Sequence, residues 1–420
     1  MNEVTSRRRF GRRGLAGIVA AALLLPVLLA GCSIPERSVA VPESQTIAAV
    51  IPGMPANIRY FVDKDPQPFI DEALASFNRA QAWRASQGQT GPLPTAYFLA
   101  ISGGGDNGAF TAGLLNGWTE AGDRPVFGGV TGVSTGALIA PLAFLGPEYD
   151  QALRDSYTKI SQKDIFLARG ITAAFFDDAM ADTQPLFQFV SKIITAEFLA
   201  KIAAEYQKGR LLLVGTTDLD ARRPVIWNMT AIANVGTPAA LQLFRKILVA
   251  SASIPGAFPP VMIDVEVAGK RYQEMHVDGG AMAQVFLYPP SLNIKALSAK
   301  MNVDRKRVLY VIRNARLDPD WASVDRQTLG IAARAVDSLL HTQGVGDLYR
   351  IYLTAQRDGL DYNLAYIPAD FTTPHTEQFD TTYMRSLFDY AFEKARHGYP
   401  WQKYPPGFTP GETAAAAGGS

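Results

Sequence analysis

The sequence predicts an α/β protein, a three-layer α/β/α sandwich in which a central sheet lies between two layers of helices. Short apolar runs alternate along the chain with longer stretches of helical periodicity, which is typical of a sheet covered on both faces. The apolar runs are nearly continuous, as expected for strands buried on both sides. A chain of 420 residues, 48% of them hydrophobic, is long enough to bury such a core.

The expected strands and helices follow one another in order. We predict strands at 96–101, 126–131, 211–216, 225–227, 261–267 and 308–312. We predict helices at 70–85, 109–120, 135–144, 185–204, 239–251 and 331–340. Ligands of open α/β sheets bind at the carboxyl ends of the strands, so the turns that follow strands are where chemistry is expected.

The N-terminus has the pattern of an export signal. Five arginines precede an uncharged apolar run, 15–30, that is short for a membrane span. The run ends in the residues LAGC at 29–32, which resemble a bacterial lipobox, and Cys32 is the only cysteine of the chain. We therefore expect a lipoprotein whose lipidated Cys32 becomes the mature N-terminus and binds the membrane. A plain signal peptide or membrane anchor is the alternative.

Two further details concern the route and destination of export. Residues 6–10, SRRRF, resemble a twin-arginine motif, although a generic basic region has the same composition. Ser33 after the lipidated cysteine fits the pattern of outer-membrane sorting. The expected product is an exported bacterial lipoprotein at the outer membrane, with its face of the membrane left open.

We divide the chain into four parts. These are a signal peptide (1–31), a Pro-punctuated tether (32–68), a folded domain (69–404) and a Pro-, Gly- and Ala-rich tail expected to be disordered (405–420). Because Cys32 is expected to be acylated, the domain has no disulfide and depends on its core.

The charge balance excludes some classes of partner. Without residues 1–31 the chain has 35 basic and 38 acidic residues, so it offers no global basic field for nucleic acid. No group of His, Cys and Asp residues has the spacing of metal ligands, and we expect neither a metal nor a cofactor. The oligomeric state stays open.

The first turn that is a candidate for catalysis or binding is the run SGGGDNG at 102–108, after the predicted strand 96–101. Its glycines let backbone N–H groups approach a guest closely, and the helix that follows adds unpaired donors and a positive dipole end. This suits an oxyanion or a phosphate. The run also contains GxGxxG, but no acidic ribose ligand follows at the distance a dinucleotide site needs.

The second turn is Gly132-Val133-Ser134-Thr135-Gly136, between a predicted strand and a predicted helix. A GxSxG motif in this context is typical of a nucleophile elbow, which lifts the serine Oγ out of the backbone. Ser134 is therefore the candidate nucleophile. The alternative is a glycine-rich packing turn with an ordinary N-cap serine.

The third turn, HVDGG at 276–280, offers a base. A serine hydroxyl is a poor nucleophile until a base removes its proton, and Asp278 is the candidate. The two glycines after it indicate a backbone that passes close to another group. A simple β-turn is the alternative.

Together these segments resemble the patatin-like phospholipases, whose pattern is a Gly-rich oxyanion block, a GxSxG elbow and a distant Asp-Gly-Gly or Asp-Gly-Ala. The segments GTTD at 215–218 and ASASIPGAFPP at 250–260 are also similar to blocks of that family. The resemblance extends over about 95–290. It implies a patatin-like fold and a lipid acyl hydrolase of the phospholipase A or lysophospholipase type, a serine esterase acting on a lipid or acyl-ester substrate.

The resemblance implies a Ser–Asp dyad without histidine. Asp278 would take the proton of Ser134, and the oxyanion would be held by backbone N–H groups. The residues implied as oxyanion donors are Gly103, Gly104 and Gly105. The residues implied as supporting the motifs are Gly108, Gly132, Gly136, Gly279 and Gly280.

The sequence departs from the family pattern in its oxyanion block. The family often has Asp at the first position and Arg or Lys before the last Gly, whereas this chain has Ser102 and Asn107. Without that cation the loop itself does not attract a phosphate head group, so the resemblance supports an acyl ester more strongly than a phospholipid. The sequence suggests no role for Asp106.

Two other functions stay open at this point. One is a Ser–His–Asp triad on an α/β-hydrolase, using one of the four histidines His276, His341, His375 and His397. No late histidine follows a strand in a Gly-flanked turn, which disfavours the triad. The other is a non-catalytic, membrane-tethered binding lipoprotein, although such a protein would commonly lack Ser134 or Asp278.

An acyl chain needs an apolar groove. The candidate lining is 165–167, 171–176 and 182–186, with Phe258 and Phe286 added because they lie near the motifs. The segment 171–176, with its two adjacent phenylalanines, is a candidate lid or interfacial face. A core helix is the equally acceptable interpretation.

Overall fold

The computed structural model describes residues 37–168, 178–319 and 321–408, and in this part of the chain a nine-stranded sheet forms the centre of the fold. Its strands are β1 (Arg59–Tyr60), β2 (Ala96–Ile101), β3 (Gly129–Gly132), β6 (Leu211–Asp218), β7 (Arg223–Asn228), β8 (Val261–Val267), β9 (Lys270–Asp278), β10 (Arg307–Arg313) and β11 (Leu360–Tyr366). The short strands β4 (Leu167–Ala168) and β5 (Ala181–Asp182) pair separately.

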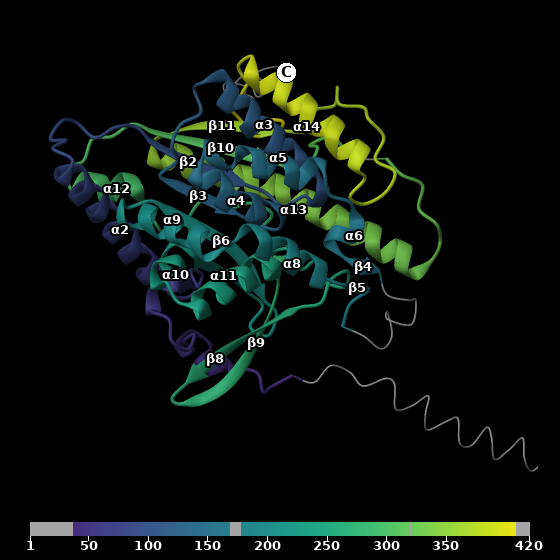
Figure 1. The fold of residues 1–420 in the computed structure, drawn as a ribbon, viewed down its shortest axis with the longest axis horizontal. Helices are drawn as coiled ribbons and strands as arrows, with labels where there is room; N and C mark the ends of the chain where they lie inside the picture. Colours follow the sequence, from purple (N-terminus) through teal and green to yellow (C-terminus); the bar gives the residue numbers. More distant parts are fainter. Residues whose placement is uncertain (1–36, 169–177, 320, 409–420) are drawn as a thin grey trace, which may run out of the picture.

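Helices surround the sheet (Figure 1). They are α2 (Gln67–Ser86), α3 (Gly108–Ala121), α4 (Thr135–Leu145), α5 (Asp150–Thr158), α6 (Gln162–Ile165), α8 (Gln184–Ile193), α9 (Ala196–Gln207), α10 (Met229–Val235), α11 (Pro238–Ser251), α12 (Ile294–Lys300), α13 (Thr328–Asp358) and α14 (Thr381–Arg396). Short 3₁₀ turns lie at Glu43–Ala48, Ala56–Ile58, Gly105–Asn107, Pro147–Tyr149 and Gly279–Ala281.

The sheet is mostly parallel. Its order is β1-β7-β6-β3-β2-β10-β11, and the five strands from β6 to β11 in this order are parallel to their neighbours. Strands β7 and β9 pair with β6 antiparallel, and β8 pairs with β9 as a hairpin that extends from the domain (Figure 1). The predicted α/β fold with helices on both sides of a sheet is confirmed.

Alternate residues of the central strands enter two different cores, because successive side chains of a strand point to opposite faces. Leu99 and Ile101 of β2 pack in the core that contains α3, α4, α11 and α14. Ala100, between them, packs in the core formed with α2 and α13. All three side chains are fully buried, which explains why the strand reads as a continuous apolar run.

The helices α3 and α14 lie side by side at unusually close range (Figure 1). A Cβ added at Gly113 would lie 2.1 Å from the carbonyl oxygen of Phe388, and one added at Gly117 would lie 2.3 Å from that of Phe392. Only glycine allows this contact. It fastens the C-terminal helix to the helix that starts at the Gly-rich loop.

The observed elements differ from the predicted ones where polar residues interrupt the pattern. Strand β9 reads KRYQEMHVD and was not predicted, because it is an antiparallel strand with exposed residues at its start. The predicted helix 185–204 is two helices, since Thr195 caps α9 by accepting a hydrogen bond from the N–H of Phe198. The predicted helix 331–340 is part of the much longer α13.

The structure also places the domain boundary earlier than the predicted tether over 32–68. Arg37 forms a two-pronged ion pair with Asp220, at 2.7 and 2.8 Å. Ile58 and Phe61 are buried in the core, and β1 adds to the sheet edge. From residue 37 onward the chain therefore belongs to the folded domain, because its scattered apolar residues have partners that a local pattern does not reveal.

Several predictions fall on residues outside the described ranges. These are the signal peptide 1–31, the lipidated Cys32, the candidate lid at 171–176 and the tail from 409. Residues 405–408 of the predicted tail pack on the domain, with the Phe408 ring 5.1 Å from that of Tyr352. Among the helices in the described ranges, none combines the length and hydropathy needed to cross a bilayer.

Candidate active site

The three predicted turns meet at the carboxyl edge of the sheet. Strands β2 and β3 are parallel neighbours with Ile101 paired to Gly132, so the Gly-rich loop and the serine turn leave the sheet side by side. Strand β9 ends beside β6, where Asp278 pairs with Thr216. A Cβ added at Gly103 would lie 3.0 Å from the Cβ of Ser134, which shows how closely the first two turns approach.

Ser134 occupies a strained turn between β3 and α4. Its φ of 56° and ψ of −128° are costly for a residue with a side chain. The glycines on both sides make the turn possible: a Cβ at Gly132 would lie 2.3 Å from the carbonyl oxygen of Gly136, and one at Gly136 would lie 2.4 Å from that of Ile101. The chain thus concentrates strain at the candidate nucleophile, as the elbow prediction expects.

The backbone of Ser134 is held by a second serine. The N–H of Ser134 donates to the Oγ of Ser251 at 3.0 Å, and that hydroxyl donates to the carbonyl oxygen of Gly215 at 2.7 Å. Ser251 is fully buried at the end of α11. It lies in the ASASIP segment, which resembles a block of the family. No local sequence pattern predicted that it positions Ser134.

Asp278 lies at the end of β9 and is 4% exposed. Its Oδ1 accepts the N–H of Gly280 at 2.6 Å, and its own N–H donates to the carbonyl oxygen of Ser253 at 2.8 Å. Burial raises the pKa of Asp278 to about 7, against hydrogen bonds from the Ser134 hydroxyl and the Gly280 N–H that lower it. A carboxylate with that pKa is suited to accept a proton near neutral pH.

The glycines after Asp278 also have defined roles. A Cβ at Gly279 would lie 2.4 Å from the carbonyl oxygen of Gly215, and one at Gly280 would lie 2.7 Å from the Gln284 side chain. These contacts let the turn lie against β6. The predicted supporting glycine Gly108 is equally constrained, since a Cβ there would lie 2.5 Å from the ring of Tyr157.

The three glycines predicted as oxyanion donors are not equivalent. The N–H of Gly103 already donates to the carbonyl oxygen of Gln284 at 3.0 Å, which corrects its prediction as a free donor. Gly104 has a φ of 150°, and a Cβ there would lie 2.1 Å from the carbonyl oxygen of Asn314. Within the described ranges, the N–H groups of Gly104 and Gly105 donate no hydrogen bond, so they are the candidate donors.

Asn314, which sequence reasoning missed, fixes the Gly-rich loop to β10. Its N–H donates to the Oγ of Ser102 at 2.8 Å, and its side-chain amide donates to the carbonyl oxygen of Ser102 at 3.0 Å. The Thr111 hydroxyl donates to the Asn314 side-chain oxygen at 2.6 Å. Ser102, which departs from the family pattern, therefore fastens the loop to the neighbouring strand.

Asp106, which had no predicted role, joins the loop to the C-terminal part of the chain. Its carboxylate accepts from the Nε2 of His375 and from the N–H of Phe379, both at 2.7 Å. Hydrogen bonding to Asp106 raises the pKa of His375. Beside it, the Tyr383 hydroxyl donates to the Asn107 side chain at 2.7 Å. These contacts hold the chain around 375–383 over the Gly-rich loop.

None of the four histidines, all of which are described, forms a hydrogen bond with Ser134 or Asp278. His375 is bound to Asp106, and His397 lies exposed with its Nδ1 near the carbonyl oxygen of Glu393. His341 lines the same cavity as Ser134 but is not bound to it. His276 is fully buried and contacts Glu274 and Thr216. The geometry thus disfavours the triad alternative.

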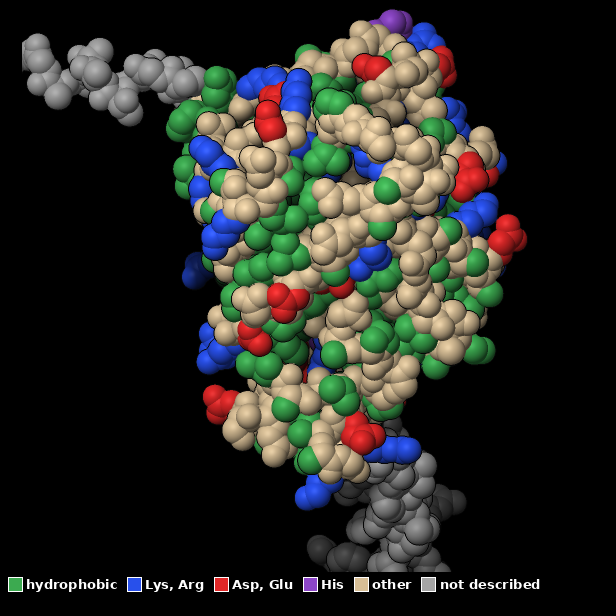
Figure 2. Space-filling view, turned by 90° about the vertical axis from the view of Figure 1, so that its left-hand side faces the viewer, with side chains coloured by type: hydrophobic (Ala, Val, Ile, Leu, Met, Phe, Trp, Pro, Cys, Tyr) green, Lys and Arg blue, Asp and Glu red, His purple; other side chains and the backbone are tan. Residues whose placement is uncertain are grey.

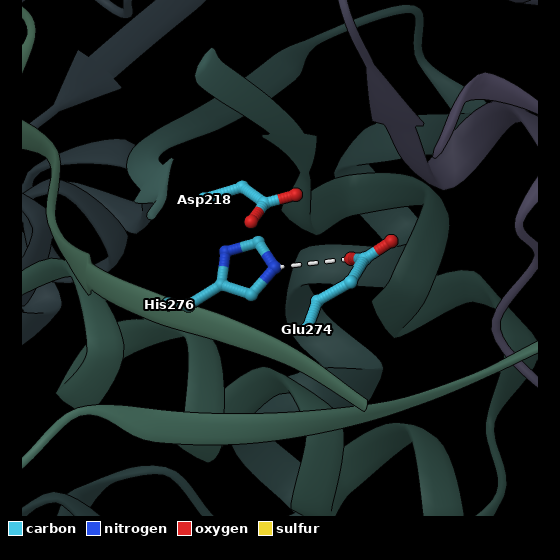
Figure 3. Close-up of side chains that lie close together, drawn as sticks. All are labelled: Asp218, Glu274 and His276. Carbon is cyan, nitrogen blue, oxygen red and sulfur yellow. Dashed lines mark hydrogen bonds and ion pairs between the residues drawn. The ribbon is translucent and has the colours of Figure 1, made fainter. Parts of the chain in front are cut away.

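His276 belongs to a buried polar cluster with Asp218 and Glu274 (Figure 3). Its Nε2 lies 3.1 Å from Glu274, and its Nδ1 lies 3.0 Å from the Thr216 hydroxyl. Both ring nitrogens are thereby engaged. The guanidinium of Arg59 forms an ion pair with Glu274 and already supplies the compensating positive charge. We assign the cluster to structure, because its ligand atoms are satisfied by protein partners.

Ser134 and Asp278 open into a cavity of about 760 Å³, which we call the site cavity. Most of its wall is apolar, and its lining includes Leu138, Leu142, Ile165, Leu186, Phe189, Ile193, Leu248, Ile254, Phe258 and Phe379. The predicted groove residues Ile165, Leu186 and Phe258 are among them. Phe286 instead lines a separate cavity of about 140 Å³, so its predicted place in the groove was wrong.

Comparison with known proteins gives one family and two solved structures. Residues 99–289 match the family model described as "Patatin-like phospholipase". VipD from Legionella pneumophila is 11% identical, with a TM-score of 0.37 over 73% of this chain and 67% of its own. Human GIVD cytosolic phospholipase A2 is 10% identical, with a TM-score of 0.29 over 65% of this chain and 49% of its own.

These structural likenesses are distant. The chain spans about half the length of the human protein, and neither likeness is close enough to carry an argument. No curated protein sequence matches this chain. The family model is therefore the comparison that bears on function, and it covers the segment that contains all three turns.

Proposed function

We propose that the protein is a lipid acyl hydrolase with a Ser134–Asp278 dyad, starting from the match of residues 99–289 to the family model of patatin-like phospholipases. One observation carries the proposal. Ser134, on a strained elbow, lines an apolar cavity together with the buried carboxylate of Asp278, whose pKa its hydroxyl lowers. That arrangement supplies a nucleophile, its base and room for an acyl chain.

The first step transfers one proton and forms one bond. Asp278 accepts the proton of the Ser134 hydroxyl while the Oγ attacks the ester carbonyl carbon. Negative charge then develops on the carbonyl oxygen, and the free N–H groups of Gly104 and Gly105 stabilise it. Donors fixed in advance for this oxygen contribute roughly 3–4 kcal/mol each to such reactions.

The remaining steps return the enzyme to its starting state. The tetrahedral intermediate collapses, the bond to the leaving alcohol breaks, and Asp278 gives its proton to that alcohol. Water then attacks the acylated Ser134, with Asp278 accepting a proton from the water. Release of the carboxylic acid and return of the proton to Ser134 complete the cycle. A pKa of about 7 suits Asp278 to both directions of transfer.

We further propose that the domain is held close to a membrane by lipidated Cys32. Arg37, the first residue that the structure describes, donates hydrogen bonds to Asp220 and to the carbonyl oxygen of Gln273 in the β8–β9 hairpin. An extended chain spans at most ~3.6 Å per residue, so five steps from residue 32 reach at most about 18 Å. Metabolic labelling with radioactive palmitate tests the lipidation: label is expected on the wild type and absent from Cys32→Ala.

The hydrolase proposal is tested by labelling with a fluorophosphonate probe, which reacts only with an activated serine. We expect labelling and short-ester hydrolysis by the wild type, and loss of both in Ser134→Ala. Ser338→Ala is the control, because that serine lies exposed on α13 and, within the described ranges, its one hydrogen bond goes to the carbonyl oxygen of Arg334. If wild type and Ser134→Ala behave alike, the chain is not a serine hydrolase, and the binding-lipoprotein alternative gains support.

A further inference from the structure

The site cavity contains a cation that neither the motifs nor the dyad use. Arg313 is the last residue of β10, the strand that lies next to β2 in the sheet. It lines the same cavity as Ser134 and Asp278, and its residue is 3% exposed. Among the described lining residues it is the only Lys or Arg.

The guanidinium of Arg313 forms few hydrogen bonds with the rest of the protein. Within the described part of the chain, its one hydrogen bond runs from Nη2 to the carbonyl oxygen of His341, at 3.3 Å. Its Nε is buried without a hydrogen-bond partner. A buried cation without an ion pair is costly, and arginine stays charged even where burial lowers its pKa.

Among the described residues, no carboxylate neutralises this charge by contact. Asp347 attracts Arg313 electrostatically, but no ion pair joins the two in the described ranges. The Asp347 carboxylate instead accepts the N–H of Gln284 at 2.7 Å and lies 3.0 Å from Arg350. The arginine therefore retains donors for a guest in the cavity.

The backbone fixes Arg313 relative to the oxyanion loop. The next residue, Asn314, is bound to Ser102 and lies against Gly104, so the start of the Arg313 side chain is anchored beside the candidate donors. On the other side, Gly344 of α13 leaves the space that the guanidinium fills. A Cβ at Gly344 would lie 1.8 Å from the Nη1 of Arg313.

From these observations we propose that Arg313 binds the phosphate of a phospholipid head group while Ser134 attacks the acyl ester. The proposal rests on the hydrolase function and narrows its substrate class. A guanidinium matches phosphate oxygens in geometry and charge, which a neutral lipid does not offer. Arg313 thereby supplies, from β10, the positive charge that Asn107 does not bring to the Gly-rich loop.

The test compares two soluble substrates that differ only in the head group. They are monomeric dihexanoyl phosphatidylcholine and dihexanoylglycerol. For Arg313→Gln we expect kcat/KM on the phospholipid to fall at least about tenfold, because a charge-assisted contact is lost. On dihexanoylglycerol it should fall less than about twofold. Arg313→Lys, which keeps the charge, should recover part of the phospholipid activity.

Two more variants separate recognition from folding. Gly344→Ala keeps Arg313 but displaces its guanidinium, and alanine favours a helix, so we expect the same selective loss in a folded protein. Arg316→Gln is the matched control, because Arg316 lies outside the cavity lining and pairs with Asp318 at 2.9 Å. It should leave both activities unchanged. Thermal unfolding by circular dichroism reports on the fold of each variant.

Free phosphate is the second possible source of the same ligand chemistry. Inorganic phosphate should inhibit dihexanoylglycerol hydrolysis by the wild type and not by Arg313→Gln. If only this inhibition depends on Arg313, and phospholipid turnover does not, the head-group assignment is overturned. It is also overturned if Arg313→Gln lowers both substrate activities equally, or lowers neither. A wild type that hydrolyses neither substrate and resists the fluorophosphonate contradicts the hydrolase proposal itself.

Discussion

Two cavities of nearly equal size lie at opposite ends of the same sheet. The site cavity, about 760 Å³, contains Ser134 and Asp278 at the carboxyl ends of their strands. The other, about 750 Å³, is lined where strands begin, as at Ala96, Gly129 and Leu211, and we call it the amino-end cavity. Figure 2 faces the side of the molecule that carries α2 and α12, whose residues line the amino-end cavity. Both have mostly apolar walls, so neither size nor apolarity identifies the site.

The two cavities differ in the backbone strain and in the charged residues at their walls. At the amino-end cavity Glu205 is paired with Lys208 at 2.6 Å and with Arg210 at 2.8 Å. At the site cavity the serine has a positive φ, and Asp278 is buried without an ion pair among the described residues. Arginines without an ion pair among the described residues also line the amino-end cavity, where Arg305 is repelled by Arg307 and Arg84. The feature that distinguishes the carboxyl ends is therefore the strained serine beside a buried carboxylate of raised pKa.

The largest expected effect is at Asp278. Asp278→Asn removes the base but keeps the shape of the side chain, so we expect kcat/KM for a short ester to fall by about 10³-fold or more. The four histidine-to-alanine variants should retain most of the activity, because none of these histidines contacts the dyad. Ester assays on all five variants provide the measurement. A histidine whose loss equals that of Asp278 would restore the triad alternative.

The next effect separates two neighbouring glycines. Gly104→Ala places a Cβ 2.1 Å from the Asn314 carbonyl oxygen at a φ of 150°, so the loop must move and its donors with it. We expect kcat to fall by about 10²-fold, the typical cost of losing an oxyanion donor. Gly105→Ala has a φ of 59° with open space around the added atom, and should cost much less. Equal losses would place the oxyanion donors elsewhere.

The sequence predicted those parts of the site that are local in the chain. The three Gly-rich turns, Ser134 and Asp278 could be identified because tight turns require glycine at fixed offsets. What it missed depends on residues far apart: Arg313 ends β10 and Asn314 follows it, and His375 reaches Asp106 across more than 250 residues. No local pattern marks those contacts.

The prediction of the strands had the same limit, because it too relied on local patterns. Buried parallel strands such as β2 were predicted with their correct bounds, since both faces are apolar. Strand β11 reads LDYNLAY and was missed, because Asp361 and Asn363 interrupt the apolar run. In the structure the Asn363 side chain donates to the carbonyl oxygen of Leu309 on β10, at 3.1 Å. Its polarity is satisfied by a neighbour that the sequence does not place.

The third effect is a dependence on pH, and its sign differs for activity and stability. Burial raises the pKa of Asp278 from 3.8 to about 7, and a base must be ionised. Below pH 7 we therefore expect kcat/KM to fall about tenfold per pH unit, with a plateau above. A flat profile between pH 5 and 8 would contradict Asp278 as the base.

Stability should change in the opposite direction. The folded state holds this proton more tightly than the unfolded chain, so the favourable contribution is complete below about pH 4 and is lost as the pH rises to about 7. The change is at most about 4 kcal/mol, by linkage. Asp278→Asn removes it, so at pH 8 the inactive variant should unfold at a higher temperature than the wild type. Calorimetry at pH 5 and pH 8 measures the difference.

The smallest effect compares the two cavities directly. Val126 and Leu339 are similarly exposed, at 73% and 69%, and line the amino-end cavity and the site cavity respectively. Because tryptophan at either position projects from the surface, neither variant should unfold the domain. Leu339→Trp narrows the site cavity and should lower kcat/KM several-fold on long-chain esters and little on short ones. Val126→Trp should change the activity on neither ester class by more than about twofold, because substrate is expected at the carboxyl ends of the strands. A larger loss in Val126→Trp would show that the amino-end cavity also binds substrate.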